Sequence, residues 1–150
     1  MENFDSQKAA RVWSRVQGQS AGLDAQQLPE LIARELNDAN TYLMLSRRLQ
    51  GRDSVLLRQM AQQEQDHAAC LKGLYMLITG TQPVVPVMTP QQQDIDRLLR
   101  NCYGNQMHRL ARYETMGTTP EYGHLFARMA KQEQEHCHRV LALLGRLKKK

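Results

Sequence analysis

One short pattern occurs twice in this chain and limits what the chain can fold into. Each copy is Glu-x-x-His, first at Glu64 and His67 and again at Glu133 and His136, and a Met-Ala pair precedes each copy. On a helix, residues three apart lie on one face, about 5–6 Å apart at Cβ, so a carboxylate and an imidazole at this spacing can hold one metal ion together. Two such pairs on facing helices are what a dinuclear carboxylate site in a four-helix bundle requires.

The rest of the sequence predicts an all-α protein. The chain of 150 residues is long enough for one domain with a buried core, and its few aromatic residues favour a helical bundle. We predict an N-terminal helix with a linker over 1–22 and a four-helix bundle over 23–150. A capping Asp53 or Ser54 is expected where the second long helix begins. The predicted helices are a short one over 6–17 and four long ones over 28–49, 54–79, 91–116 and 120–147.

The segment between the second and third long helices, 80–90, contains three prolines. Proline cannot continue a helix, and it favours extended backbone in the residue before it. Eleven extended residues at up to ~3.3 Å each reach roughly 36 Å, which is the length of a helix of ~24 residues. The segment can therefore run the length of the bundle and start the third helix at the end where the second helix starts. This predicts a bundle with one long crossover.

The first and third long helices also correspond to each other. Glu35 and Tyr42 are seven residues apart, as are Gln106 and Tyr113, and the two pairs are offset by 71 residues. The chain therefore consists of two helical hairpins of one design. Pairing them by pseudo-twofold symmetry places six candidate metal ligands at a similar depth near the middle of the bundle: Glu35, Glu64, His67, Gln106, Glu133 and His136.

This order of motifs resembles the ferritin-like superfamily of di-iron carboxylate proteins, and most of all its rubrerythrin-like branch. The motifs are Glu-x6-Tyr, Glu-x-x-His, a long crossover and then the same pair again, and the resemblance covers the four long helices. It implies a ferritin-like four-helix bundle holding two iron ions. By this resemblance Glu64 and Glu133 would bridge the ions, His67 and His136 would each bind one, and Glu35 would be a terminal ligand.

The resemblance also implies an activity. Di-iron proteins of this type carry out redox chemistry with peroxide or O₂, so peroxide reduction or ferroxidase activity is expected. Tyr42 and Tyr113 would form hydrogen bonds to the ligands from outside the metal shell. The rubredoxin-type Cys-x-x-Cys domain of rubrerythrins proper is missing from this sequence, so an enzyme of this kind would need a separate electron donor.

Two residues of the third helix depart from the family pattern. Gln106 stands where the family has a Glu, and Arg109 stands one turn later, where rubrerythrins proper have another Glu. Four Glu and two neutral His would balance two divalent ions, whereas with Gln106 one positive charge is left over, which is costly in a low dielectric. The departures therefore put the second metal ion in question.

Two alternatives follow for the asymmetric site. In the first, Asp38 becomes an extra ligand, and its negative charge restores the balance with two divalent ions. Asp38 corresponds to Arg109 in the repeat. In the second, Arg109 pairs with Glu35 or Asp38 and takes the place of one metal ion, so that the site holds one iron or none. A bundle with an empty site would be a structural or interaction protein instead of an oxidoreductase.

Composition and charge limit the kinds of partner and the cellular location that we expect. The formal charge is +5 with a short lysine run at the C-terminus, but no basic stripe is interleaved with aromatic residues, so we expect no nucleic-acid partner. No segment approaches 18 consecutive apolar residues, and the acidic N-terminus lacks the apolar region of a signal peptide. Three cysteines without Cys-x-x-Cys spacing indicate reduced thiols and a cytoplasmic location. A homodimer is expected by analogy with bundles of this type.

Overall fold

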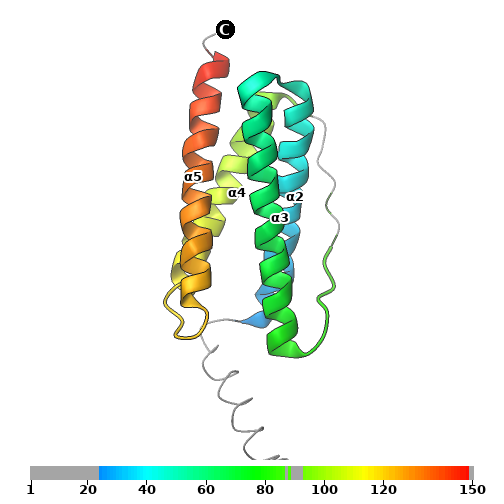
Figure 1. The fold of residues 1–150 in the computed structure, drawn as a ribbon, viewed down its shortest axis with the longest axis vertical. Coiled ribbons are helices and arrows are strands. Elements are labelled where there is room, and N and C mark those ends of the chain that lie inside the picture. The colour runs from blue at the N-terminus through cyan, green and yellow to red at the C-terminus, as the bar shows by residue number, and fades with distance from the viewer. Residues whose placement is uncertain (1–23, 87, 89–92, 149–150) are drawn as a thin grey trace, which may run out of the picture.

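A computed structural model describes residues 24–86, 88 and 93–148 of the chain. This part contains helices and no strand, so the predicted all-α class is confirmed (Figure 1). The short helix predicted over 6–17, like the whole of the predicted N-terminal unit over 1–22, lies outside the described residues. None of the described helices is both long enough and apolar enough to cross a membrane. The elements are a 3₁₀ turn, η1 (Ala25–Gln27), and four α-helices: α2 (Leu28–Arg48), α3 (Gly51–Thr79), α4 (Ile95–Met116) and α5 (Gly123–Lys148).

The first hairpin, α2 and α3, is joined by a turn of only two residues. Gly51 begins α3 with a φ of 63°, a left-handed conformation that glycine adopts without steric cost. The helix therefore starts earlier than the sequence predicted, and the expected cap by Asp53 or Ser54 is wrong. The cap residue is Gln50, which makes no capping hydrogen bond with its side chain, and Ser54 instead donates to the carbonyl oxygen of Ser46 at 2.7 Å.

The second hairpin, α4 and α5, has a longer turn over residues 117–122. A Cβ atom placed on Gly123 would lie 2.4 Å from the carbonyl oxygen of Gly117, so the two backbone segments can approach this closely only with glycine. This contact ends the turn and starts α5 at Gly123, three residues later than the predicted start at Pro120. The third long helix also starts late, at Ile95, with residues 93 and 94 in non-helical conformation.

Contacts between helix ends establish how the two hairpins face each other. At the end of α2, Arg48 Nη1 donates to the carbonyl oxygen of Gln93, just before α4, at 2.9 Å. Near the end of α5, Arg146 Nη2 donates to Asp53 Oδ1 in the first turn of α3 at 2.8 Å. Helices α3 and α4 therefore start at the same end of the bundle (Figure 1).

The apolar core consists of two separate clusters, one toward each end of the bundle. One contains Leu31, Leu71 and Phe126, and the other contains Leu45, Leu57 and Leu143. Along every helix, the residues of one cluster are followed by two buried polar residues and then by residues of the other cluster. Apolar burial at both ends thus stabilises the bundle and encloses a polar layer at its middle.

Candidate metal centre

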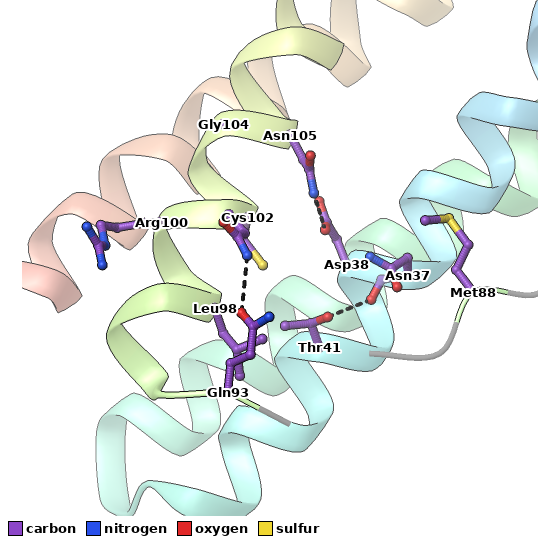
Figure 2. A pocket seen from close by; sticks show the side chains of 11 residues that line it. Asn37, Asp38, Thr41, Met88, Gln93, Leu98, Arg100, Cys102, Gly104 and Asn105 are labelled. Carbon is purple, nitrogen blue, oxygen red and sulfur yellow. Dashed lines mark hydrogen bonds between the residues drawn. The ribbon is translucent and has the colours of Figure 1, made fainter. Parts of the chain in front are cut away.

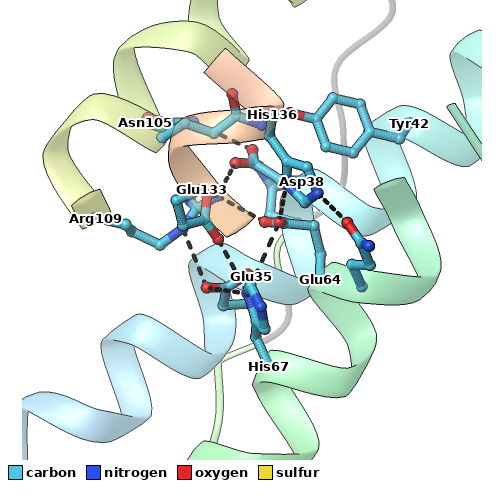
Figure 3. Close-up of polar contacts among 12 residues, drawn as sticks. Glu35, Asp38, Tyr42, Glu64, His67, Asn105, Arg109, Glu133 and His136 are labelled. Carbon is cyan, nitrogen blue, oxygen red and sulfur yellow. Dashed lines mark hydrogen bonds and ion pairs between the residues drawn. The ribbon is translucent and has the colours of Figure 1, made fainter. Parts of the chain in front are cut away.

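Each helix contributes two polar side chains to the buried layer, and in each helix the two residues are three positions apart. This spacing puts both side chains on the same inward face. All eight are buried, with at most 4 % of the side chain exposed. They come in order from α2, α3, α4 and α5: Glu35 and Asp38, Glu64 and His67, Gln106 and Arg109, and Glu133 and His136. Figure 3 labels all of them except Gln106.

Four of these residues bring potential ligand atoms to one point. The atoms come from Glu35, Glu64, His67 and Glu133, and all lie within 4.8 Å of one another. His67 Nδ1 lies 3.1 Å from Glu133 Oε1 and 3.4 Å from Glu35 Oε1. Glu35 Oε2 and Glu64 Oε1 are buried oxygens without a hydrogen-bond partner, which a cation would satisfy. Three carboxylates and one imidazole are a donor set suited to a divalent transition metal, so these residues fit one ion.

Arg109 lies at the centre of the same layer and contacts every carboxylate in it. Its Nη2 atom donates to Asp38 Oδ2 at 2.6 Å, to Glu64 Oε2 at 2.7 Å and to Glu133 Oε2 at 3.3 Å. Its Nε atom lies 3.3 Å from Glu35 Oε1. Burial would lower the pKa of Arg109, but the four carboxylates raise it well above its usual value, so the guanidinium stays charged. The protein thus carries its own cation among the carboxylates.

The structure contains the ion pairs that the second sequence-based alternative for Asp38 and Arg109 describes. Arg109 pairs with both Glu35 and Asp38, as the second alternative requires. Asp38 Oδ2 is held by Arg109 and Asp38 Oδ1 accepts a hydrogen bond from Asn105 at 3.4 Å, and among the described residues Asp38 is not in the converging ligand group. The residues present therefore do not fit two ions, because the guanidinium bonds to the carboxylate oxygens that a second ion would need.

The two remaining candidate ligands are Gln106 and His136. Gln106 Nε2 donates to the hydroxyl oxygen of Tyr42, while Gln106 Oε1 has no hydrogen-bond partner. His136 Nδ1 lies 2.6 Å from Glu64 Oε1, yet neither atom makes a hydrogen bond. Two acceptor atoms so close together require a proton or a cation between them. Of these two residues, His136 contacts the ligand group through Glu64, whereas the amide of Gln106 is bonded to Tyr42.

Two glutamines that the sequence analysis did not single out orient the histidines. Gln132 Oε1 contacts His67 Nε2, and Gln63 Oε1 lies 2.5 Å from His136 Nε2, so each histidine is held by the residue before the glutamate of the other motif. An amide oxygen accepts, so each Nε2 carries the proton and, in the neutral imidazole, the Nδ1 lone pair faces the centre. The signal was in the sequence, since Gln precedes Glu in both copies of the motif.

The two histidines differ in their protonation. Burial alone would lower the pKa of His67, but its bonds to Glu133 and Glu35 raise it to about 10. For His136, burial lowers the pKa to about 4, and the positive charges of His67 and Arg109 act in the same direction. Without a metal ion, His67 is therefore a cation at neutral pH and His136 is neutral. The pKa of Glu64 is also shifted: burial and the charges of Glu133 and Glu35 raise it well above its usual value.

The two tyrosines bond to the layer in a crossed pattern. Tyr113 on α4 donates its hydroxyl to Glu35 Oε1 on α2 at 2.6 Å, and Tyr42 on α2 accepts from Gln106 on α4. Burial raises the pKa of both phenols well above their usual values, so both keep their protons. These are the positions in which the family resemblance expected hydrogen-bonding tyrosines.

No protein-family model and no curated protein matches this sequence.

Proposed function

We propose that this chain is a ferritin-like protein that binds one divalent metal ion, with Arg109 in the place of a second. The observation that carries the proposal is the position of the Arg109 guanidinium, bonded to Asp38, Glu64 and Glu133, beside a converging group of three carboxylates and His67. A bound iron ion would supply one-electron redox chemistry, using peroxide or O₂ as oxidant and an outside electron donor.

Charge balance supports one ion over two. The four buried carboxylates carry four negative charges when ionised. Arg109 and one divalent ion together carry three positive charges, so one negative charge remains. Burial raises the pKa of Asp38, so a proton there can remove the remaining charge. A second divalent ion would instead leave a surplus positive charge in a low dielectric, which is costly.

The test is the metal content of the purified protein. After anaerobic reconstitution with Fe²⁺ and removal of unbound metal, we expect one iron per chain by elemental analysis. His67→Gln removes a ligand and should abolish binding, whereas His108→Gln, at an exposed position on α4, should leave it unchanged. Two iron ions per wild-type chain would contradict the proposal.

A symmetrised variant tests the part assigned to Arg109. Gln106→Glu combined with Arg109→Leu gives α4 the carboxylate of α2 and removes the resident cation. This double variant should bind two iron ions per chain. Gln106→Glu alone should stay at one, because Arg109 still holds Glu64 and Glu133.

The second candidate function is a metal-free structural or interaction protein. Its supporting observation is that Arg109 and a protonated His67 already provide two positive charges among the carboxylates. A wild-type chain that stays free of iron, manganese and cobalt after reconstitution would favour this candidate and exclude the one-metal centre.

A further inference from the structure

A cavity of about 530 Å³ opens between α2 and α4 beside the polar layer. These two helices belong to different hairpins and pack against each other much less closely than the helices within each hairpin. Asn37, Asp38 and Thr41 line the cavity from α2, and Gly104 and Asn105 line it from α4 (Figure 2). The cavity is therefore an opening at the seam between the two hairpins.

The cavity and the carboxylate layer share one residue, Asp38. Figure 2 shows the side chains of Asp38 and Asn105 pointing toward one another across the seam, where Asn105 Nδ2 donates to Asp38 Oδ1. The other oxygen of Asp38 accepts from Arg109 Nη2, and the same nitrogen reaches Glu64 Oε2 at 2.7 Å. Asp38 is only 1 % exposed, so it forms the inner wall of the cavity. From this wall, two hydrogen bonds through Arg109 lead to the ligand Glu64.

The polar part of the lining suits a hydrated cation. Carboxamides and a hydroxyl group offer oxygen atoms, and the lining cation, Arg100, is a largely exposed side chain that pairs with Asp96 at 3.5 Å. A divalent ion with six waters occupies roughly 180 Å³ at ~30 Å³ per water, which is well below the cavity volume. Asparagine and threonine oxygens can replace water molecules around a hard cation one at a time.

We propose that this cavity is the entrance through which a hydrated divalent cation reaches the buried centre, and that Asp38 receives the ion there. The ion first meets the carboxamides of the seam. It then displaces Arg109 from Asp38 and passes to Glu64, while Arg109 keeps its bond to Glu133. The inference rests on the proposed function, since it requires a metal centre behind Asp38.

Gly104 provides a way to block the cavity without touching the ligands. A Cβ atom placed there meets no atom within 4 Å, and the same holds for Gly73 on an exposed part of α3. Gly104→Phe should fill the entrance, and Asn101→Trp should do the same from the preceding turn of α4. Gly104→Ala and Gly73→Phe are the matched controls, one for the loss of glycine and one for an added aromatic ring.

The measurement is the rate of Co²⁺ uptake by each full-length protein, followed by visible absorbance in a stopped-flow instrument, together with the equilibrium Kd. The two blocking variants should slow uptake by about tenfold with an unchanged Kd, and both controls should match the wild type. Uptake at the wild-type rate in both blocking variants would overturn the entrance while leaving the metal centre intact. A wild-type protein that binds no Co²⁺ would overturn the proposed function, and the entrance with it.

Discussion

The two hairpins repeat one pattern, but their first helices carry different charges at its corresponding positions. In the first hairpin α2 supplies Glu35 and Asp38, and in the second α4 supplies Gln106 and Arg109 at the positions related by the offset of 71 residues. All four side chains are buried at the same layer. At these positions α2 thus brings two acids, and α4 brings a neutral amide and the cation that pairs with the carboxylates of the layer. The comparison teaches that a repeat can keep the depth and spacing of its buried positions while one acid is exchanged for a guanidinium that pairs with the remaining carboxylates.

Removing Arg109 should have the largest effect on stability. In metal-free protein, Arg109→Leu leaves four buried carboxylates without their guanidinium, and breaking a buried ion pair by removing one partner costs about 3–5 kcal/mol. The free energy of unfolding is measured with urea in the presence of a chelator. Arg112→Leu, which loses only a bond at 2.6 Å to Gln27 near the surface, should cost less than about 1 kcal/mol. Equal losses in the two variants would argue against a central role for Arg109.

The two histidines should respond to pH in opposite directions. The folded-state pKa of His67 is about 10, above the ordinary 6.5, so its contribution to stability is complete below pH 6.5 and is lost as the pH rises toward 10. The folded-state pKa of His136 is about 4, so its contribution is complete above pH 6.5 and is lost as the pH falls toward 4. Each loss approaches ~1.4 kcal/mol per pH unit inside its window.

Unfolding of metal-free variants across pH checks this assignment. The stability difference between wild type and His67→Gln should shrink between pH 7 and 10. The difference between wild type and His136→Gln should shrink between pH 6 and 4. The same pH dependence for both variants would show that the two motifs are electrostatically equivalent. It would contradict the assignment of different pKa values to His67 and His136.

The two glutamines that orient the histidines should differ in their effect on metal affinity. Gln132→Ala frees Nε2 of the proposed ligand His67, and loss of such an outer partner typically lowers metal affinity by about 10–100-fold. Gln63→Ala frees His136 instead, which lies outside the converging ligand group among the described residues, so its effect should be only a few-fold. Competitive titration with a chromophoric chelator gives both values. A larger loss of metal affinity in Gln63→Ala than in Gln132→Ala would indicate that His136, and not His67, binds the metal.

The tyrosine pair should show the smallest difference. Tyr113→Phe removes a hydrogen bond to the carboxylate of Glu35, and bonds to charged groups contribute about 1.5–3 kcal/mol. Tyr42→Phe removes a bond from the neutral amide of Gln106, for which about 0.5–1.5 kcal/mol is usual. Thermal unfolding of the two variants side by side measures the difference. A greater loss of stability in Tyr42→Phe than in Tyr113→Phe would contradict the assignment of the charged hydrogen bond to Tyr113 and Glu35.

Much of the fold could be predicted from local sequence because helix formation depends on local sequence. Periodic apolar residues and the proline-rich connection predicted four helices within a few residues of the observed ends. Two of the errors lie at turns: Gly51 begins its helix in a left-handed conformation, and Gly123 lies against the backbone of Gly117, which no local pattern records. The eight polar residues of the layer were likewise within reach of the sequence, since spacing of three residues on a helix sets which face they share.

What the sequence by itself determined is therefore the set of helices and the residues that meet at the middle of the bundle. Only the tertiary structure decided how those residues pair. Arg109 bonds to carboxylates from α2, α3 and α5, and the histidines of two matching motifs have pKa values of about 10 and about 4. The physical reason is that charge interactions depend on distance and burial across helices, and neither quantity is fixed by spacing within a single helix.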